Sequence, residues 1–340
     1  LTSITIPETV ETINANAFDG TAITNIILPQ KVKTIGASAF AGSKIKSVTI
    51  PKNVTAINAN TFQNCKDLET VVFECENLAK IDNYAFAGSG IKRISLPKNV
   101  MSIGTNAFEN CDSLTTVEFD EDSALTTIGN YAFAGSGITS ITVPKNVKTI
   151  GANVFENCGS LKSVIFEEDS MLETIGNYAF RGSAIENMII PKSVTSIGNY
   201  AFANCASLMT VEFADGIVLS SIGEGAFAGS SITSIIIPVS VTSIGNAAFE
   251  NCGSLTTVTF KDGSLLSSIG ERAFAGCVGI AQMTLPEGIT SVGARAFDGW
   301  LSTQKIVMTA SEDAVDEWNL QWESGSQADI EWPTEENSEE

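Results

Sequence analysis

Residues 129–158 read GNYAFAGSGITSITVPKNVKTIGANVFENC, and this stretch contains two copies of one pattern. The pattern is an apolar segment of the form I/L-x-x-I/V-x-Φ, where Φ is apolar, followed by V-x-x-I-G and a closing Ala-Phe or Val-Phe. The two copies close at Phe133 and Phe155. Because the same unit recurs from Leu1 to about Met308, the chain is predicted to be an array of short repeats.

Phenylalanine marks the period of the array. From Phe86 to Phe274, steps of 22 and 25 residues alternate, which gives a super-period of 47 residues. A period in the low twenties lies in the leucine-rich-repeat range, where one unit cannot bury its apolar face alone and must stack on its neighbours. The marker residues are Phe18, Phe40, Phe62, Phe86, Phe108, Phe133, Phe155, Phe180, Phe202, Phe227, Phe249, Phe274 and Phe297.

Each repeat divides into three pieces. The first, such as Ile138–Val143, is rich in Ile, Val and Thr and predicts a short strand, which must pair in parallel with the strand of the next repeat. The second, such as Val147–Gly151, predicts a brief extended segment closed by a glycine turn. The third ends in Ala-Phe and predicts one turn of 3₁₀ helix with Phe in the core.

The predicted fold class is therefore α/β and β-dominated. We expect a right-handed leucine-rich-repeat solenoid with a parallel concave β-sheet of about 13–14 short strands. Short 3₁₀ or helical turns are expected on the convex side, and a helical cap at the C-terminal end.

The third residue after the core Phe is mostly Ser or Cys, in alternation, and the residue before it is mostly Gly or Asn. A small, weakly polar side chain there is predicted to hydrogen-bond the backbone. Most of these thiols lie two coils apart, roughly 10 Å, which exceeds the ~7 Å Cα limit of a disulfide, so we predict that all six are free and buried. The six are Cys65, Cys111, Cys158, Cys205, Cys252 and Cys277. Cys75 lies outside this column, in a loop after a strand, and is the one thiol that the sequence leaves open to exposure.

Composition excludes several classes of function. A net charge of −20 argues against nucleic acid and anionic membrane surfaces, which bind basic surfaces. No apolar run approaches the length of a membrane span, so no membrane insertion is predicted for this chain. The chain has no histidine, which removes Ser-His-Asp and Cys-His constellations, and we predict a protein that is not an enzyme and has no cofactor.

The longer repeats carry a three-residue acidic insertion after the strand, as at Asp120–Ser123 and Glu167–Ser170. Carboxylates clustered on loops can hold Ca²⁺. The spacings of the EF-hand and of the calcium-binding nonapeptide repeat are absent, however, so we expect a solvated rim and no Ca²⁺ on these loops.

The second, third and fifth places of each predicted strand are expected to face outward on the concave side. Their composition is mostly Ser and Thr, which strand propensity alone explains, but charged and aliphatic residues interrupt it. Because solenoids bind through their concave faces, these interruptions are candidate protein-binding residues. They are Lys46, Glu69, Lys92, Arg93, Glu118, Lys162, Ile165, Glu186, Ile189 and Glu212.

Three segments are expected along the chain: the solenoid at 1–308, a C-terminal cap at 309–332 and a disordered acidic tail at 333–340. Ser311 is a plausible N-cap for a helix that runs to Trp322. The opening LTSITIP already matches the middle of a repeat, and no signal peptide is evident. We therefore expect the chain to begin inside a longer protein.

The unit L-x-x-I-x-Φ-P-x-x-V-x-x-I-G-x-x-A-F-x-x-C resembles the BspA-type leucine-rich repeat of bacterial surface proteins, and Pro144, Gly151, Phe155 and Cys158 are among the residues that carry it. The resemblance implies an extracellular or cell-surface location. It also implies adhesion to host matrix proteins or other cells, with no catalytic residues to transfer. The expected function is thus a protein-binding module, and the alternative is a structural spacer or stalk in a larger surface protein.

Overall fold

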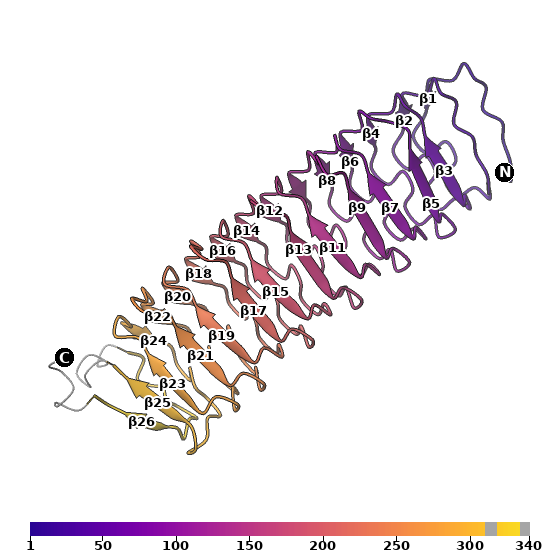
Figure 1. Ribbon diagram of the computed structural model, residues 1–340. Helices are drawn as coiled ribbons and strands as arrows, with labels where there is room; N and C mark the ends of the chain where they lie inside the picture. The colour runs from indigo at the N-terminus through magenta and orange to yellow at the C-terminus, as the bar shows by residue number, and fades with distance from the viewer. Residues whose placement is uncertain (310–317, 334–340) are drawn as a thin grey trace. The chain divides into compact units, whose positions relative to one another are not determined.

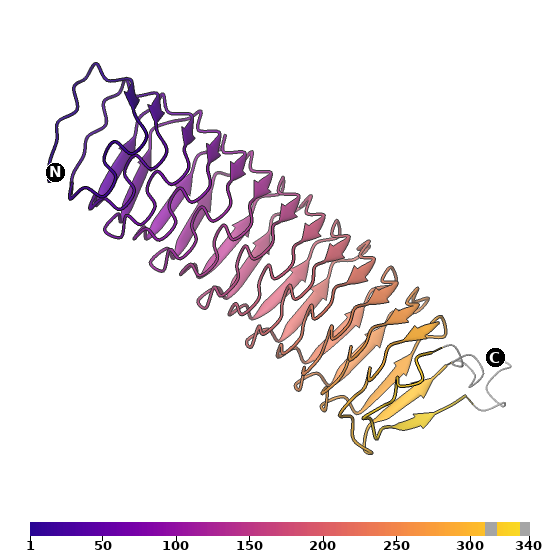
Figure 2. The same ribbon diagram turned by 180° about the vertical axis from the view of Figure 1, so that it is seen from behind.

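The computed structural model describes residues 1–309 and 318–333. The chain divides into two units, Leu1–Leu172 and Glu173–Glu340, called unit 1 and unit 2. Each unit is a parallel β-solenoid in which four-residue strands line one face and two-residue strands line a separate edge (Figures 1 and 2). No helix occurs among the described residues, so the α component of the expected α/β class is wrong.

In unit 1 the four-residue strands form one sheet, in the order β13-β11-β9-β7-β5-β3. They are β3 (Ser47–Ile50), β5 (Thr70–Phe73), β7 (Arg93–Leu96), β9 (Thr116–Phe119), β11 (Ser140–Val143) and β13 (Ser163–Phe166). The two-residue strands are β1 (Thr12–Ile13), β2 (Thr34–Ile35), β4 (Ala56–Ile57), β6 (Lys80–Ile81), β8 (Ser102–Ile103), β10 (Thr127–Ile128) and β12 (Thr149–Ile150).

Unit 2 repeats this arrangement, with its longer strands in two sheets, β15-β17-β19-β21 and β23-β25-β26. They are β15 (Asn187–Ile190), β17 (Thr210–Phe213), β19 (Ser234–Ile237), β21 (Thr257–Phe260), β23 (Gln282–Leu285), β25 (Lys305–Met308) and β26 (Asp329–Glu331). The two-residue strands are β14 (Thr174–Ile175), β16 (Ser196–Ile197), β18 (Ser221–Ile222), β20 (Ser243–Ile244), β22 (Ser268–Ile269) and β24 (Ser291–Val292).

The strand prediction is confirmed in both of its parts. The strands pair in parallel and in register, as where Ile141 of β11 lies opposite Val164 of β13. Buried and exposed side chains alternate along β11, as expected for a strand with one face on the core. The V-x-x-I-G piece forms the two-residue strand and ends in a glycine such as Gly151. A Cβ there would come within 2.8 Å of Asn130, so no larger residue fits between the coils.

The core Phe side chains stack directly on one another along each unit. In unit 1 the rings from Phe18 to Phe155 lie 5.2–5.6 Å apart between centroids and within 14° of parallel. In unit 2 the rings from Phe180 to Phe297 lie 5.2–6.0 Å apart. Most of these rings are completely buried. The Phe side chain is therefore the core plug that the sequence predicts.

The 3₁₀ turn expected before each Phe is wrong. Its place is taken by successive tight turns in which every fourth residue is left-handed, as at Tyr131 (φ 57°) and Gly135 (φ 65°). The N–H groups of Tyr131, Phe133 and Gly135 donate to carbonyls of the next coil at 2.8–3.0 Å, while those between them close local turns. A 3₁₀ helix would direct every N–H along its own coil, so the coil-to-coil hydrogen bonds exclude it.

The Ser/Cys column explains the two-coil period. Each column thiol donates to the carbonyl of the preceding coil's core Phe. Cys65 Sγ, for example, donates to the Phe40 carbonyl at 2.9 Å and also lies 3.5 Å from Ser43 Oγ. The residue before the thiol, Asn64, is left-handed and holds its side-chain oxygen over Gly88 of the next coil. A Cβ at Gly88 would lie 2.6 Å from that oxygen, so an Asn coil requires a Gly coil after it.

All seven cysteines are free and buried, as predicted for the six in the column. Cys75, whose exposure the sequence leaves open, is only 1 % exposed. Its loop turns the thiol inward, together with the fully buried Leu78. Burial raises the pKa of Cys65, Cys75, Cys111, Cys158, Cys205 and Cys252 to about 11, and that of Cys277 well above its ordinary value.

The C-terminal end departs from the repeat. Trp300 takes the column position and donates its indole N–H to the Phe274 carbonyl at 2.9 Å, as the thiols do. The expected helix from Ser311 falls largely on 310–317, outside the described residues, and 318–325 form turns, so a helical cap is not supported. Trp322 instead packs edge-on against Phe297 at the end of the stack, and β26 closes the sheet. The tail expected at 333–340 also lies outside the described residues, except for Pro333.

The buried thiols lead to a direct chemical prediction. The thiolate is the form that reacts with Ellman's reagent, and burial holds the thiol pKa near 11. At pH 8, none of the cysteines of the native protein should therefore react with this reagent within minutes. In guanidinium chloride all seven should react. Fast reaction of one thiol in the folded protein, assigned to Cys75 by mass spectrometry, would contradict the burial of that loop.

The Phe stack leads to a second prediction. Phe133→Ala should lower the free energy of unfolding by about 3–5 kcal/mol, because it opens a cavity between two fully buried rings. Phe119→Ala is the matched control in the same unit, because Phe119 ends β9 half-exposed. Urea titration of both variants should show less than half the loss for Phe119→Ala. Equal losses would mean that the stack does not hold the coils together.

Candidate functional site

The candidate site is the outward face of the four-residue strands, called the strand face here. It comprises the first and third residues of each such strand and the residue just before the strand, which are the third, fifth and second places of the sequence pattern. The structure places all ten predicted residues on it. Glu186 is half-buried and the other nine are exposed. Lys46, Glu69, Lys92, Arg93, Glu118, Lys162 and Ile165 belong to unit 1, and Glu186, Ile189 and Glu212 belong to unit 2.

A charged cluster occupies β5, β7 and β9 in unit 1. Lys92 Nζ lies 2.8 Å from Glu69 Oε2, and Arg93 lies 3.6 Å from the Glu118 carboxylate. The hydroxyl of Ser95 donates to the other oxygen of Glu118 at 2.5 Å. The hydrogen bond and charge of Lys92 lower the pKa of Glu69. The structure thus joins four predicted residues into two linked ion pairs, which fix where charge is presented along this face.

The other predicted residues lie outside this cluster. Lys46 precedes β3 on the far side of Glu69, and its charge adds slightly to the lowering of the Glu69 pKa. Ile165 lies in β13, two strands beyond β9, and Lys162 immediately precedes that strand. In unit 2, Ile189 of β15 lies directly opposite Glu212 of β17 in the sheet register.

Along the series of longer strands, fully paired neighbours alternate with neighbours that pair only in part. The pairs β3/β5, β7/β9 and β11/β13 match along all four residues, as do β15/β17 and β19/β21. Between these pairs, β5/β7, β9/β11 and β17/β19 match only at their first residue, and β21 and β23 belong to different sheets. The strand before each incomplete match ends in Phe and runs into the longer, acidic loop. The strands therefore separate toward their C-terminal ends.

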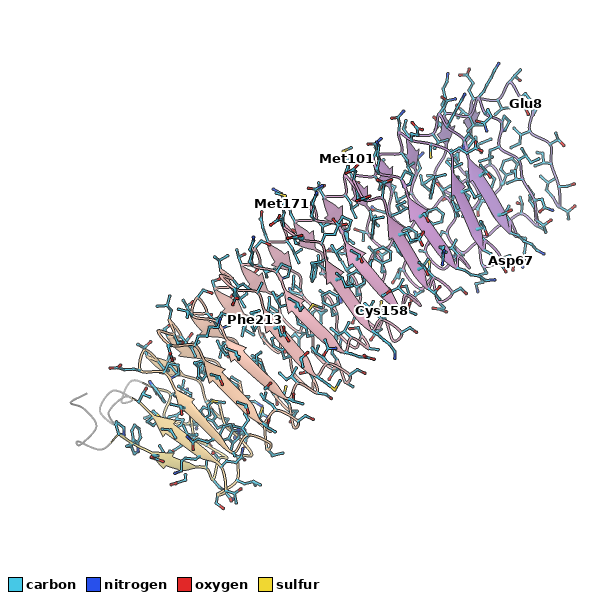
Figure 3. All side chains as sticks on the ribbon, in the orientation of Figure 1. Glu8, Asp67, Met101, Cys158, Met171 and Phe213 are labelled. Atoms are coloured by element: carbon cyan, nitrogen blue, oxygen red, sulfur yellow. The ribbon has the colours of Figure 1, made fainter. Side chains whose placement is uncertain are left out.

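Each incomplete match opens a shallow cleft in the strand face. The cleft volumes are about 460 Å³ between β5 and β7 and about 310 Å³ between β9 and β11. In unit 2 they are about 410 Å³ between β17 and β19 and about 820 Å³ between β21 and β23. A half-buried Phe at the strand end lines each one, as Phe213 of β17 does (labelled in Figure 3). The side chains that differ from cleft to cleft are those of the strand face.

The strand face also holds residues that the sequence-based selection left out. Val72, Met209 and Ile236 are each about half exposed (48, 49 and 53 %), although all three are apolar. Val72 and Ile236 line clefts. Aligning the repeats would have found these residues, because they occupy the same outward places as Ile165 and Ile189. The sequence indicates the clefts only indirectly, through the alternation of 22- and 25-residue steps between the core Phe residues.

Neither a metal site nor a membrane span is found within residues 1–309 and 318–333. No group of three or more Cys, Asp or Glu side chains in that part of the chain is placed to hold a metal ion. Nor does that part form a helix of the length and hydropathy that a bilayer crossing requires.

Comparisons with known proteins support this picture of the fold. A leucine-rich repeat protein from Bacteroides ovatus is 27 % identical over 96 % of this chain and 88 % of its own, with a TM-score of 0.79. The pneumococcal vaccine antigen PcpA is 22 % identical over 97 % of this chain and 88 % of its own, with a TM-score of 0.54. A leucine-rich repeat protein from Eubacterium ventriosum is 24 % identical over 82 % of each chain, with a TM-score of 0.51. At these identities the last two show the fold alone.

No match was found among curated proteins. The family model described as the BspA type leucine rich repeat region (6 copies) matches residues 1–115, 79–209, 173–301 and 242–325. These matches cover nearly the whole array and confirm the family that the repeat unit resembles. The chain belongs to the BspA-type leucine-rich repeat family.

Proposed function

We propose that this chain is a non-enzymatic protein-binding module that uses the strand face for adhesion to a protein partner. The observation that carries the proposal is the contrast between the two sides of the strands. Inward places of the longer strands are occupied by the apolar residues Ile, Leu, Val, Met and Phe, whereas the outward places change in chemical type from coil to coil. A constant interior supports a varied exterior, which is how solenoids present binding surfaces.

The chemistry of the outward places suits a protein partner. Ile165, Ile189 and Ile236 keep more than half of their side-chain surface in water (56, 59 and 53 %), and a partner would remove that apolar surface from water. The ion pairs around Lys92 and Arg93 would select and orient the partner. Leucine-rich repeat proteins are a non-enzymatic family that usually binds proteins, which supports the same conclusion.

The proposed setting is the bacterial cell surface or the extracellular space, with a host matrix protein or another cell-surface protein as partner. The BspA-type family supports this setting. Buried thiols are compatible with it, because a thiol with a pKa near 11 and no solvent access resists oxidation and exchange.

A structural spacer is the second candidate, and the regularity of the coils favours it. The two-residue strands pair without interruption from β4 to β12 in unit 1 and from β14 to β24 in unit 2. A spacer needs that regularity and makes no demand on the chemistry of the strand face, so substitutions on that face separate the two functions.

The triple variant Lys92→Ala/Arg93→Ala/Lys162→Ala should bind its protein partner at least about tenfold more weakly, because it removes three of the cations of the strand face. Lys52→Ala/Lys98→Ala/Lys145→Ala is the matched control, which removes the same charge from the exposed Pro-Lys loops. Binding of the purified array to immobilised extracellular-matrix proteins and to whole bacterial cells is the measurement.

No binding by the unmodified array would contradict adhesion. Binding that both triple variants retain, or that both lose equally, would contradict use of the strand face and favour the spacer.

A further inference from the structure

The sequence Thr-Val-Glu-Phe occurs in two strands, as β9 in unit 1 and as β17 in unit 2. Both strands end at an incomplete match and line a cleft, so their backbone settings are equivalent. Their glutamates, Glu118 and Glu212, occupy the same outward place. Differences between these two glutamates therefore come from their neighbours.

The neighbours of Glu118 satisfy its carboxylate. Arg93 lies 3.6 Å from one oxygen, and Ser95 donates to the other. Glu212 has no such partners. Within the residues that the structure describes, its carboxylate makes no hydrogen bond or ion pair, and Ile189 is opposite it at the place equivalent to Ser95. Glu212 is thus a charged acceptor with unused capacity, on the wall of a cleft of about 410 Å³. Lys261 also lines this cleft, but the carboxylate that it approaches, at 3.9 Å, is that of Asp215.

Three exposed aliphatic side chains lie on the strand face near Glu212. Ile189 on β15 and Ile236 on β19 flank it, and Met209 precedes its own strand, with exposed fractions of 59, 53 and 49 %. At the equivalent places around Glu118 the residues are Ser95, Thr142 and Thr115, which are small and polar. At these places the neighbours of the same strand are therefore polar in unit 1 and aliphatic in unit 2.

We infer that Ile189, Met209, Glu212 and Ile236 form a docking site for a Lys or Arg side chain of a partner protein. The cationic head pairs with the Glu212 carboxylate in the cleft, while the methylene stem covers the three aliphatic side chains. The charge of the chain favours this partner, because residues 173–340 contain 21 Asp and Glu against 6 Lys and Arg. This site deepens the proposed function and rests on it.

The test is a methyl NMR titration of the whole chain, labelled at Ile and Met methyl groups. The probe is the peptide acetyl-Val-Thr-Arg-Thr-Val-amide, and its counterpart with Gln in place of Arg is the control ligand. The Arg peptide should shift the signals of Ile189, Met209 and Ile236 in a saturable and salt-sensitive way. Glu212→Gln should weaken its binding by about threefold or more, whereas Glu118→Gln, in the identical strand, should not change it.

Equal shifts with the Arg and Gln peptides, equal effects of Glu212→Gln and Glu118→Gln, or no shift at all would overturn the site. A thermal melt of both variants confirms that they are folded, and both glutamates are exposed enough that no loss is expected. The outcome is separable from that of the proposed function. If the array binds its partner and Glu212→Gln leaves that binding unchanged, this inference fails alone. If the array binds no protein, the proposed function fails and the titration still decides the site.

Discussion

Coil-to-coil hydrogen bonding at the Phe turns is the interaction on which the rest of the structure depends. A single coil is too small to bury its own Phe ring or to satisfy its own backbone. At the turn ending in Phe133, every second N–H donates to the next coil, and the column thiol of that coil donates back to the Phe133 carbonyl. These bonds set the coil spacing at which the rings stack. At the C-terminal end Trp300 makes the same bond with an indole N–H.

That constraint also accounts for the two-coil period and for the clefts. The left-handed position before the thiol accepts Asn or Gly, and an Asn side chain leaves room only for Gly on the next coil. Each Asn coil is therefore followed by a Gly coil, and the longer loop falls after the Asn coils. Where it does, the strands match at one residue and then separate. An interior rule thus produces a regular series of clefts on the exterior, whose walls are free to vary.

Much of this fold follows from the sequence, because the period and the Phe register determine which residues stack. The parallel strands and the buried column thiols were predictable on that basis. The turn geometry was not, because Tyr131 and Arg272 adopt a left-handed conformation that side chains of this size disfavour. Burial of Cys75 depends on the path of an irregular loop, which has no periodic signal.

The ten candidate residues lie on the face where the sequence places them, but their contacts could not be predicted in the same way. Glu118 and Glu212 have the same local sequence, and only residues on neighbouring coils, more than 20 positions away, make one of them paired and the other unpaired. The central claim is that the interior columns hold the fold while the strand face is available for recognition. The most direct test is a saturation-mutagenesis scan of the displayed chain for resistance to protease. We expect broad tolerance on the strand face and strong losses at the core Phe, the column thiols and the left-handed Asn and Gly. Losses of equal size on the strand face would contradict the claim.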